Sequence, residues 1–351
     1  MLARSFFRAV WRHNGRATHD GRLTARLVSV VAGAGGGGSD ARRSASLLEV
    51  LKQRQLVFDA TSPEIERHLE SGSASVTRET AGLTKNGESS SQQYKGSVYC
   101  GYDPTASSLH CGNLVTAAVL RHFQLAGWRP VIVLGGATGL VGDPSGRTTE
   151  RPLLDLELVR ANTQRIGESL RSLFRPLPLH SNNDHNRATS TAPSSFHMPE
   201  PIVVNNIDWF HEVRVLEFLR EIGKHFTMAQ LLGKHSVKSR AEHGLSFTEF
   251  SYQLLQATDF LRLYENHHCT VQIGGSDQWG NITSGIHLIN RLHGHADHRL
   301  PIDDAASSND TPLAFGLTIP LLTTSTGEKI GKSAGNAAVR SIIQCAIVAH
   351  S

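Results

Sequence analysis

The 351-residue sequence has few cysteines and no long hydrophobic run. The four cysteines lie 11, 158 and 76 positions apart, without a Cys-x-x-Cys pair or a nearby His-x-x-x-His motif: Cys100, Cys111, Cys269 and Cys345. This spacing excludes the common zinc sites and indicates reduced thiols, so we expect no metal site. The longest apolar stretch, Pro130–Gly142, is glycine-rich and shorter than the roughly 18 residues that a membrane-spanning helix needs. We therefore expect no contact with a membrane.

The composition excludes a disordered or fibrous chain, because 39% of the residues are hydrophobic and only 19% are charged. At roughly 100–200 residues per domain, this length allows two domains or one large α/β domain with appendages. No internal repeat is visible in the sequence.

The positive charge is concentrated in the N-terminal 46 residues. This segment has eight arginines, no lysine and two acidic residues, which gives 8 − 2 = +6, so the remainder carries 4 − 6 = −2. The high pI is thus no argument that the folded part binds nucleic acid. Hydrophobic side chains among the arginines, such as Phe6, Phe7 and Trp11, are typical of a mitochondrial transit peptide over 1–46, cleaved between 30 and 50. The alternative is a disordered basic tail; import would place the protein in the mitochondrial matrix.

Apolar segments of strand and helix length alternate along the rest of the chain. We predict strands at Ser97–Tyr102, Val131–Gly135, Ile202–Asn205 and Thr270–Ile273, and a helix at Leu114–Ala126 that is closed by Gly127. Strands that are apolar on both faces and separated by helices predict a parallel sheet of the α/β class. Ligands of such sheets bind at the carboxyl ends of the strands.

Three polar stretches interrupt this pattern. Segments at about 179–201 and 293–311 are rich in polar residues and proline, and we interpret them as surface insertions within one domain. A third, 71–95, precedes the first strand.

Two motifs at opposite ends of the domain carry candidate chemistry. The segment Asp103–Asn113 leads directly into a helix, whose N-terminal amides attract anions, and its side chains supply donors to phosphate. The segment Gly327–Asn336 places Lys329 and Lys332 three positions apart between glycines, where they could stabilise charge on a transferring phosphate. Taken singly, a helix cap at His110 and a solvated lysine turn are the simpler explanations.

Together the two motifs resemble the signature pair of class I aminoacyl-tRNA synthetases. Four further segments are similar to tyrosyl-tRNA synthetases of the bacterial and mitochondrial type: Tyr99–Thr105, Gly135–Gly146, Ser246–Gln253 and Gly274–Asn281. The resemblance covers about 97–336, with a lead-in from residue 47. It implies a Rossmann-like parallel-sheet catalytic domain over 47–336.

The helix that follows Ser246 shows how one of these segments is built. Ser246 and Glu249 form a predicted capping box, so a helix should begin at Phe247. Tyr252, Gln256 and Asp259 then fall at i, i+4 and i+7 on one polar stripe. A solvated face is the alternative interpretation, but two uncharged residues and one aromatic ring suit a pocket wall better.

The resemblance assigns the amino-acid site. It implies that Tyr252, Gln256 and Asp143 hold the ammonium group of L-tyrosine, while Tyr99 and Asp259 hydrogen-bond its phenolic hydroxyl and Gln278 orients its carboxyl group. Phenylalanine would leave the hydroxyl-binding groups buried and unpaired. The related tryptophan enzyme is a weaker alternative, because Tyr99 and Asp259 suit a phenol.

The resemblance also assigns the ATP site. It implies that Thr105 and His110 contact the departing phosphates, and that Lys329 and Lys332 close over the pyrophosphate. The nucleotide and its ribose would be held by Asp103, Gly112, Asn113, Gly275 and Asp277. Mg²⁺ would accompany the phosphates, because the sequence shows no carboxylate cage of its own.

The sequence departs from the family pattern mainly at its end. Only 351 − 336 = 15 residues follow Asn336, so the tail 337–351 leaves no room for the family's anticodon-binding and C-terminal RNA-binding domains. We therefore expect weak binding of mitochondrial tRNA(Tyr) and impaired transfer, since phosphate neutralisation supplies much of nucleic-acid affinity. The resemblance implies a homodimer. A non-catalytic truncated isoform, acting by ligand binding or dimerisation, is the alternative function.

Overall fold

The structure is a computed structural model of the whole chain, and it describes residues 45–73, 94–146, 153–174, 198–234, 237–238, 240, 244–294 and 312–323. Several predictions lie outside these ranges. They are the transit peptide predicted over 1–46, except its residues 45 and 46, the lysine motif, the tail at 337–351, and most of the three polar stretches. No helix within the described ranges is long and apolar enough to span a bilayer.

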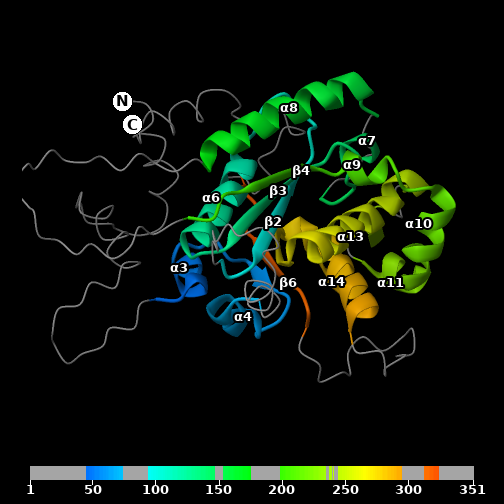
Figure 1. Ribbon diagram of the computed structural model, residues 1–351. Coiled ribbons are helices and arrows are strands. Elements are labelled where there is room, and N and C mark those ends of the chain that lie inside the picture. Colours follow the sequence, from blue (N-terminus) through cyan, green and yellow to red (C-terminus); the bar gives the residue numbers. More distant parts are fainter. Residues whose placement is uncertain are drawn as a thin grey trace, which may run out of the picture.

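The centre of the molecule is a six-stranded sheet in the order β1-β6-β5-β2-β3-β4 (Figure 1). The strands are β1 Asp59–Ala60, β2 Ser97–Tyr102, β3 Arg129–Leu134, β4 Ile202–Asn205, β5 Cys269–Gly275 and β6 Phe315–Ile319. All neighbours pair in parallel except the short edge strand β1, which runs antiparallel to β6. The predicted parallel α/β sheet is confirmed, and β2 and β4 have the predicted bounds.

The described helices surround this sheet. They are α3 Leu47–Gln53, α4 Ile65–Ser71, α6 Cys111–Leu125, α7 Thr138–Val141, α8 Leu156–Leu173, α9 Ile207–Phe210, α10 Val215–Glu221, α11 Met228–Gly233, α13 Phe247–His267 and α14 Trp279–His293. Two 3₁₀ turns are also present: η1 Gly223–His225 lies between α10 and α11, and η2 Ser276–Gln278 lies between β5 and α14. Because α14 includes His293, the second insertion begins after that residue.

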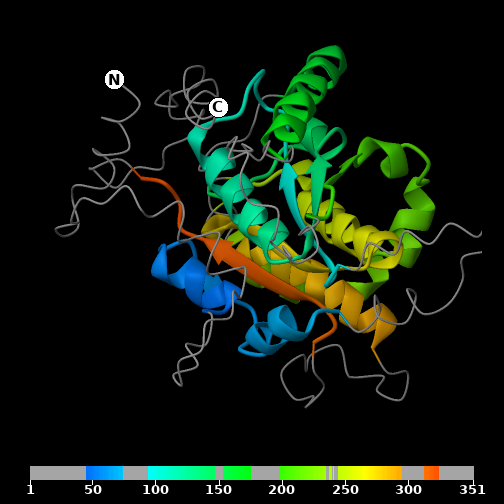
Figure 2. The same cartoon turned by 60° about the vertical axis from the view of Figure 1, so that its left-hand side comes forward.

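The alternation of side chains along the strands gives two cores, one on each face of the sheet. On β2, Val98 and Cys100 face α3, α4, α6 and α8, whereas Tyr99 faces α13 and α14. Figure 2 shows α6 and α8 on one side of the strands, and α3 and α4 beside β6. The lead-in segment is thus part of the fold, because His68 of α4 stacks on Phe315 of β6 at 4.6 Å.

The structure differs from the sequence-based expectation in where α6 begins and in how the start of α13 is capped. The helix α6 begins at Cys111 rather than residue 114, because His110 and Asn113 form a capping box. Helix α13 begins at Phe247 as predicted, and Ser246 caps it by accepting from the amide of Glu249. The second half of the predicted capping box, in which the Glu249 carboxylate would accept from the Ser246 amide, is wrong. The Glu249 carboxylate instead pairs with Arg240 at 2.6 Å, and both side chains are buried.

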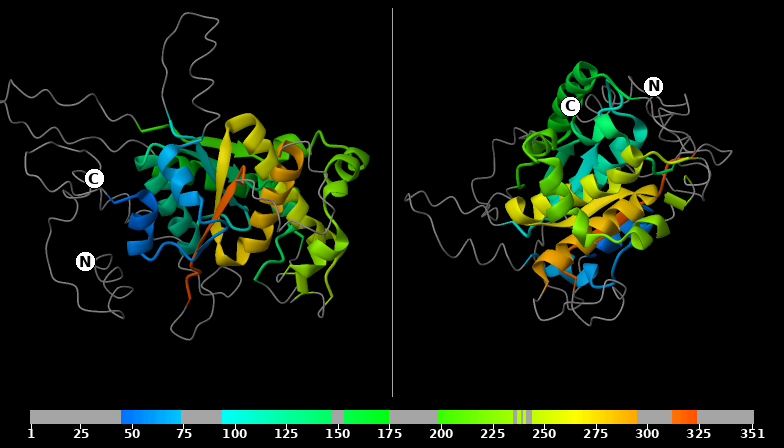
Figure 3. Two further views of the ribbon diagram at one scale, coloured as in Figure 1. Left: turned by 90° about the horizontal axis from the view of Figure 1, so that it is seen from below. Right: turned by 90° about the vertical axis from the view of Figure 1, so that its right-hand side faces the viewer.

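Two strands of the sheet, and a group of exposed apolar side chains at one end of the molecule, were not expected from the sequence. Strands β1 and β6 were not predicted, so the sheet has two more strands than expected. Figure 3 shows α10 and α11 at one end of the molecule, away from α3 and α4. Several large apolar side chains are exposed on α10, α11 and the first residue of α13: Val215, Leu216, Leu219, Met228, Leu232 and Phe247.

Candidate functional site

A single pocket contains every described residue that the sequence analysis placed in the site. It lies at the carboxyl ends of β2, β3 and β5, between the N-terminus of α6 and one face of α13. The thirteen residues are Tyr99, Asp103, Thr105, His110, Gly112, Asn113, Asp143, Tyr252, Gln256, Asp259, Gly275, Asp277 and Gln278. Lys329 and Lys332 lie outside the described residues. The individual roles of all these residues stay predictions.

The N-cap residue of α6, His110, also lines the pocket. The amide of Asn113 donates to Nδ1 of His110 at 3.3 Å, and the amide of His110 donates to Oδ1 of Asn113 at 3.1 Å. Because Nδ1 accepts a hydrogen bond, Nε2 is the ring nitrogen that can donate to an anion. A Cβ at Gly112 would come within about 3.0 Å of the His110 ring. Because the cap uses Nδ1, it is compatible with the predicted contact between His110 and a phosphate group.

Asp103 links three parts of the pocket wall. Its Oδ1 accepts from the Thr138 hydroxyl at 2.7 Å, and its Oδ2 accepts from the Tyr252 hydroxyl at 2.8 Å. These bonds connect the loop after β2 to α7 and α13. A Cβ at Gly135 would overlap Oδ1 of Asp103, which explains why a glycine follows β3 directly. Burial, and then the charge of Asp103, raise the pKa of Tyr252 above its ordinary value.

Asp259 is buried at the base of the pocket with two donors that the sequence analysis did not identify. Its oxygens accept from Nδ2 of Asn206 at 3.0 Å and from Nε1 of Trp209 at 2.9 Å. Burial nevertheless raises the pKa of Asp259 from 3.8 to about 8, because desolvation outweighs these two hydrogen bonds. Asn206 follows β4 directly, and its position at a strand end was the signal that could have identified it.

Tyr99 provides a second polar group at the base of the pocket. Its side chain is 1% exposed and packs against Phe260, with the ring centroids 5.1 Å apart. Its hydroxyl oxygen finds no hydrogen-bond partner among the residues that the structure describes. Burial, and then the charge of Asp259, raise the pKa of Tyr99. This end of the pocket can therefore accept a ligand that brings a polar hydroxyl group.

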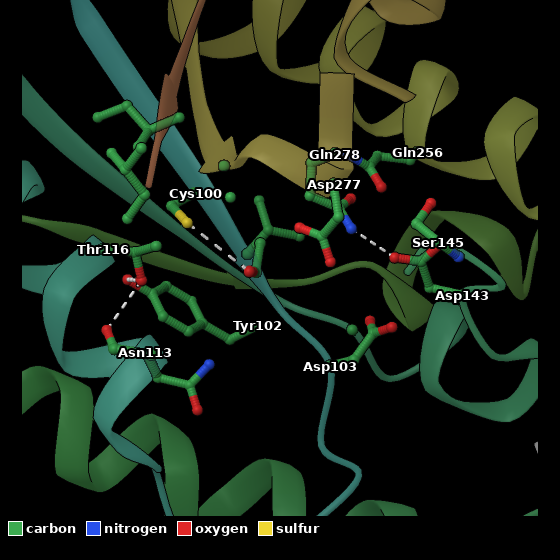
Figure 4. A pocket seen from close by; sticks show the side chains of 18 of the residues that line it. Cys100, Tyr102, Asp103, Asn113, Thr116, Asp143, Ser145, Gln256, Asp277 and Gln278 are labelled. Atoms are coloured by element: carbon green, nitrogen blue, oxygen red, sulfur yellow. Dashed lines mark hydrogen bonds between the residues drawn. The ribbon is translucent and has the colours of Figure 1, made fainter. Parts of the chain in front are cut away.

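A separate cluster of polar side chains surrounds Asp143 near α13 and η2. Nε2 of Gln278 donates to Oδ2 of Asp143 at 2.5 Å, and the Ser145 amide donates to Oδ1 at 2.9 Å. Figure 4 shows Asp143, Ser145, Gln256 and Gln278 gathered on one side of the pocket. Carboxylate and amide oxygens placed together are suitable acceptors for an ammonium group.

Further polar residues line the opposite wall, and the sequence analysis missed them. Oγ1 of Thr116 lies 2.8 Å from the carbonyl oxygen of Asn113 and 3.1 Å from the hydroxyl of Tyr102. Cys100 lies beside them (Figure 4), and burial raises the pKa of its thiol to about 11. Thr116 lies on α6, where its polar character did not distinguish it from a solvated position. In the described part of the chain no group of three His, Cys, Asp or Glu side chains could hold a metal ion.

Comparison with known proteins agrees with this geometry. The family model described as class I tRNA synthetases (W and Y) matches residues 91–342. The mitochondrial tyrosine–tRNA ligase of Saccharomyces cerevisiae is 42% identical over 303 residues, which are 86% of this chain and 54% of that protein. The tyrosine–tRNA ligase of Bacillus caldotenax is 48% identical over 236 residues, which are 67% of this chain and 48% of that protein.

A solved structure gives the same result. The crystal structure of a C-terminally truncated mitochondrial tyrosyl-tRNA synthetase of Aspergillus nidulans superimposes with a TM-score of 0.60 at 29% identity, covering 84% of this chain and 74% of that one. The chain spans about half the length of the curated relatives described above. The family model, in contrast, matches more than half of this chain. The chain therefore belongs to the class I tRNA synthetase family of the tryptophan and tyrosine enzymes.

Proposed function

We propose that this chain activates L-tyrosine with ATP to tyrosyl-adenylate and then transfers the tyrosyl group to mitochondrial tRNA(Tyr). The observation that carries the proposal is the single pocket in which all the described candidate residues meet. One part of its wall offers Tyr99 and Asp259, and another offers Asp143 with Gln256 and Gln278.

The polar groups at the base favour tyrosine over phenylalanine. Both side chains are buried, so a ligand without a hydroxyl would leave the Tyr99 hydroxyl unpaired and Asp259 with only its bonds from Asn206 and Trp209. The ring of Tyr99, which packs against Phe260 behind it, gives this end of the pocket an apolar surface that suits the aromatic ring of the ligand. The ammonium group would lie near Asp143, with Gln256 as a second acceptor.

The reaction that fits this pocket needs no enzyme nucleophile. A carboxylate oxygen of tyrosine attacks the α-phosphorus of ATP, the new P–O bond forms in line, and the bond to the β-phosphate breaks. Pyrophosphate leaves with that electron pair. Because the attacking group is already an anion, positioning and stabilisation of the phosphate charge supply the rate. Thr105 and His110 lie in the described pocket to do this, and Lys329 and Lys332 would complete the set.

Mg²⁺ would enter this site with ATP rather than occupy a site formed by the protein. Asp103, Asp143 and Asp277 line the pocket, yet no metal-binding group of three such side chains forms among the described residues. The phosphate oxygens of ATP are the hard ligands that Mg²⁺ prefers.

The test is tyrosine-dependent exchange between ATP and pyrophosphate on the purified chain, run beside aminoacylation of mitochondrial tRNA(Tyr). We expect exchange with L-tyrosine and far less with phenylalanine or tryptophan. Absence of exchange from a folded preparation, whether or not it binds tyrosine or ATP, would favour the non-catalytic alternative.

We further propose that the protein is a homodimer in the mitochondrial matrix. The exposed apolar side chains of α10, α11 and Phe247 support an interface, since Leu216 is 80% and Phe247 is 76% exposed. The composition of residues 1–46 and the yeast mitochondrial relative support the location. Sedimentation of wild type beside Leu216→Asp would test the dimer, which the variant should dissociate. Import of a reporter fused to residues 1–46 would test the location.

A further inference from the structure

Asn281 lies behind the pocket wall, where it contacts several of the residues that line it. It belongs to the first turn of α14, is 4% exposed and does not itself line the pocket. Four acceptor oxygens lie within hydrogen-bond distance of its Nδ2: Oε1 of Gln256 at 3.1 Å, Oε1 of Gln278 at 3.2 Å, Oδ1 of Asp143 at 3.4 Å and Oγ of Ser145 at 3.4 Å. All four of these residues do line the pocket.

An amide nitrogen has only two hydrogens to share among these four oxygens. The two shortest distances are to the carbonyl oxygens of Gln256 and Gln278, so these accept the stronger bonds. With its oxygen turned to Asn281, Gln278 presents its nitrogen to Asp143, as the 2.5 Å bond shows. Asn281 thus selects one of the two orientations that the side-chain amide of each glutamine could adopt.

These orientations matter for an amino-acid ligand, because an ammonium group can only donate hydrogen bonds. The carbonyl oxygen of Gln256 has a second lone pair beside the one used by Asn281, and the Asp143 carboxylate is held by Gln278 and by the Ser145 amide. If the Gln256 amide turned over, its N–H groups would face the ammonium instead. That arrangement would replace an attraction by a repulsion.

We propose that Asn281 is a positioning residue for the amino-acid substrate, which sets the amide orientations of Gln256 and Gln278 beside Asp143 without touching the ligand. The inference rests on the proposed function, and it extends that function to a residue outside the pocket lining. A purely structural asparagine would only stabilise the first turn of α14. The two roles differ in whether the effect of Asn281 depends on the ammonium group of the ligand.

The experiment compares two ligands on four proteins by calorimetric titration. The ligands are L-tyrosine and the analogue of tyrosine that lacks the ammonium group. The proteins are wild type, Asn281→Leu, which keeps the branching of the side chain and removes its polar atoms, Asn281→Ser, which keeps one donor, and Ser284→Ala as control. Ser284 is 2% exposed on the next turn of α14, and its hydroxyl donates to the carbonyl oxygen of Gly280 at 2.9 Å. Thermal unfolding of each protein is recorded alongside.

We expect Asn281→Leu to weaken L-tyrosine binding by about tenfold or more, the effect of one hydrogen bond to a charged group. The affinity of Asn281→Leu for the analogue should fall by less than about twofold, and Ser284→Ala should change the affinity for neither ligand. The KM for tyrosine in pyrophosphate exchange should rise in parallel, with the KM for ATP nearly unchanged. Asn281→Ser should fall between wild type and Asn281→Leu, and it serves as the folded variant if the leucine does not fold.

Equal weakening of both ligands, or unchanged affinity for L-tyrosine in a folded variant, would overturn the positioning role and leave the proposed function intact. A wild-type protein that binds no L-tyrosine would overturn the proposed function itself, and the inference with it.

Discussion

Raising the pH should destabilise this protein through the buried carboxyl group of Asp259. The pKa of this group is raised by burial from 3.8 to about 8, so the folded state holds a proton that the unfolded state has already released. Between these two values the folded state binds more protons, and the free energy of unfolding therefore falls as the pH rises. At about 1.4 kcal/mol per pH unit, the three units from about pH 5 to about pH 8 correspond to a fall on the order of 4 kcal/mol.

Other buried groups titrate with the opposite sign and have to be separated. Burial lowers the pKa of His68 and of His122 from 6.5 to about 4, so each favours the folded state increasingly as the pH rises from 4 to 6.5. Urea unfolding of wild type and of Asp259→Asn at matched pH isolates the aspartate, because the histidine contributions cancel in the difference. The free energy of unfolding of wild type, minus that of Asp259→Asn, should fall steadily from about pH 5 to about pH 8.

Asp155→Asn is the matched control, since it removes one carboxyl group from an exposed N-cap of α8 and leaves a residue that also caps helices. The difference in free energy of unfolding between wild type and Asp155→Asn should change far less over the same pH range. If the difference between wild type and Asp259→Asn does not vary with pH, the raised pKa and the reasoning from burial are refuted.

Three further predictions concern the site. Asp259→Ala should raise the KM for tyrosine in pyrophosphate exchange roughly tenfold to a hundredfold, the cost of leaving the buried hydroxyl of the ligand without this hydrogen-bond partner; equal loss of ATP binding would point to unfolding instead. Lys329→Ala or Lys332→Ala should lower the activation rate by about 10²-fold with little change in tyrosine affinity, and unchanged rates in both would remove this segment from the mechanism. Gly135→Ala should lower stability by about 1–3 kcal/mol in urea unfolding, because the new Cβ would overlap the Asp103 carboxylate.

Gly233→Ala is the control for the glycine prediction. A Cβ at Gly233 would meet nothing within 4 Å, so its unfolding midpoint should stay close to that of wild type. A Gly135→Ala variant as stable as this control would contradict the close approach of Gly135 to Asp103.

Local sequence signals were sufficient for the elements whose residues interact mainly with their chain neighbours. The apolar runs Ser97–Tyr102 and Ile202–Asn205 have the predicted strand bounds, and Ser246 caps α13 as its position before Phe247 predicted. The motifs along the chain also provided, in order, every described residue that the resemblance placed in the site. Strand formation and helix capping depend on side chains within a few positions, which a sequence displays directly.

Features that depend on contacts between distant segments were decided only by the tertiary structure. The second residue of strand β6 is a glycine, and Gly316 is required because a Cβ there would overlap Ile282 of α14 and come within 2.9 Å of Thr61. Likewise the sequence placed Glu249 in a capping box, whereas its carboxylate pairs with Arg240 in the interior. A buried carboxylate takes the partner that the packing brings to it, since an unpaired charge there is costly.

The chemistry of the pocket shows the same division. The sequence supplied Tyr99, Asp259 and Gln256 as candidates, but it could not show that Asp259 accepts from Asn206 and Trp209, or that Asn281 lies behind Gln256. These contacts join segments 25 to 53 positions apart. Hydrogen bonding and desolvation act over a few ångströms in space, so residue types were determined by the sequence while their protonation and orientation were determined by the fold.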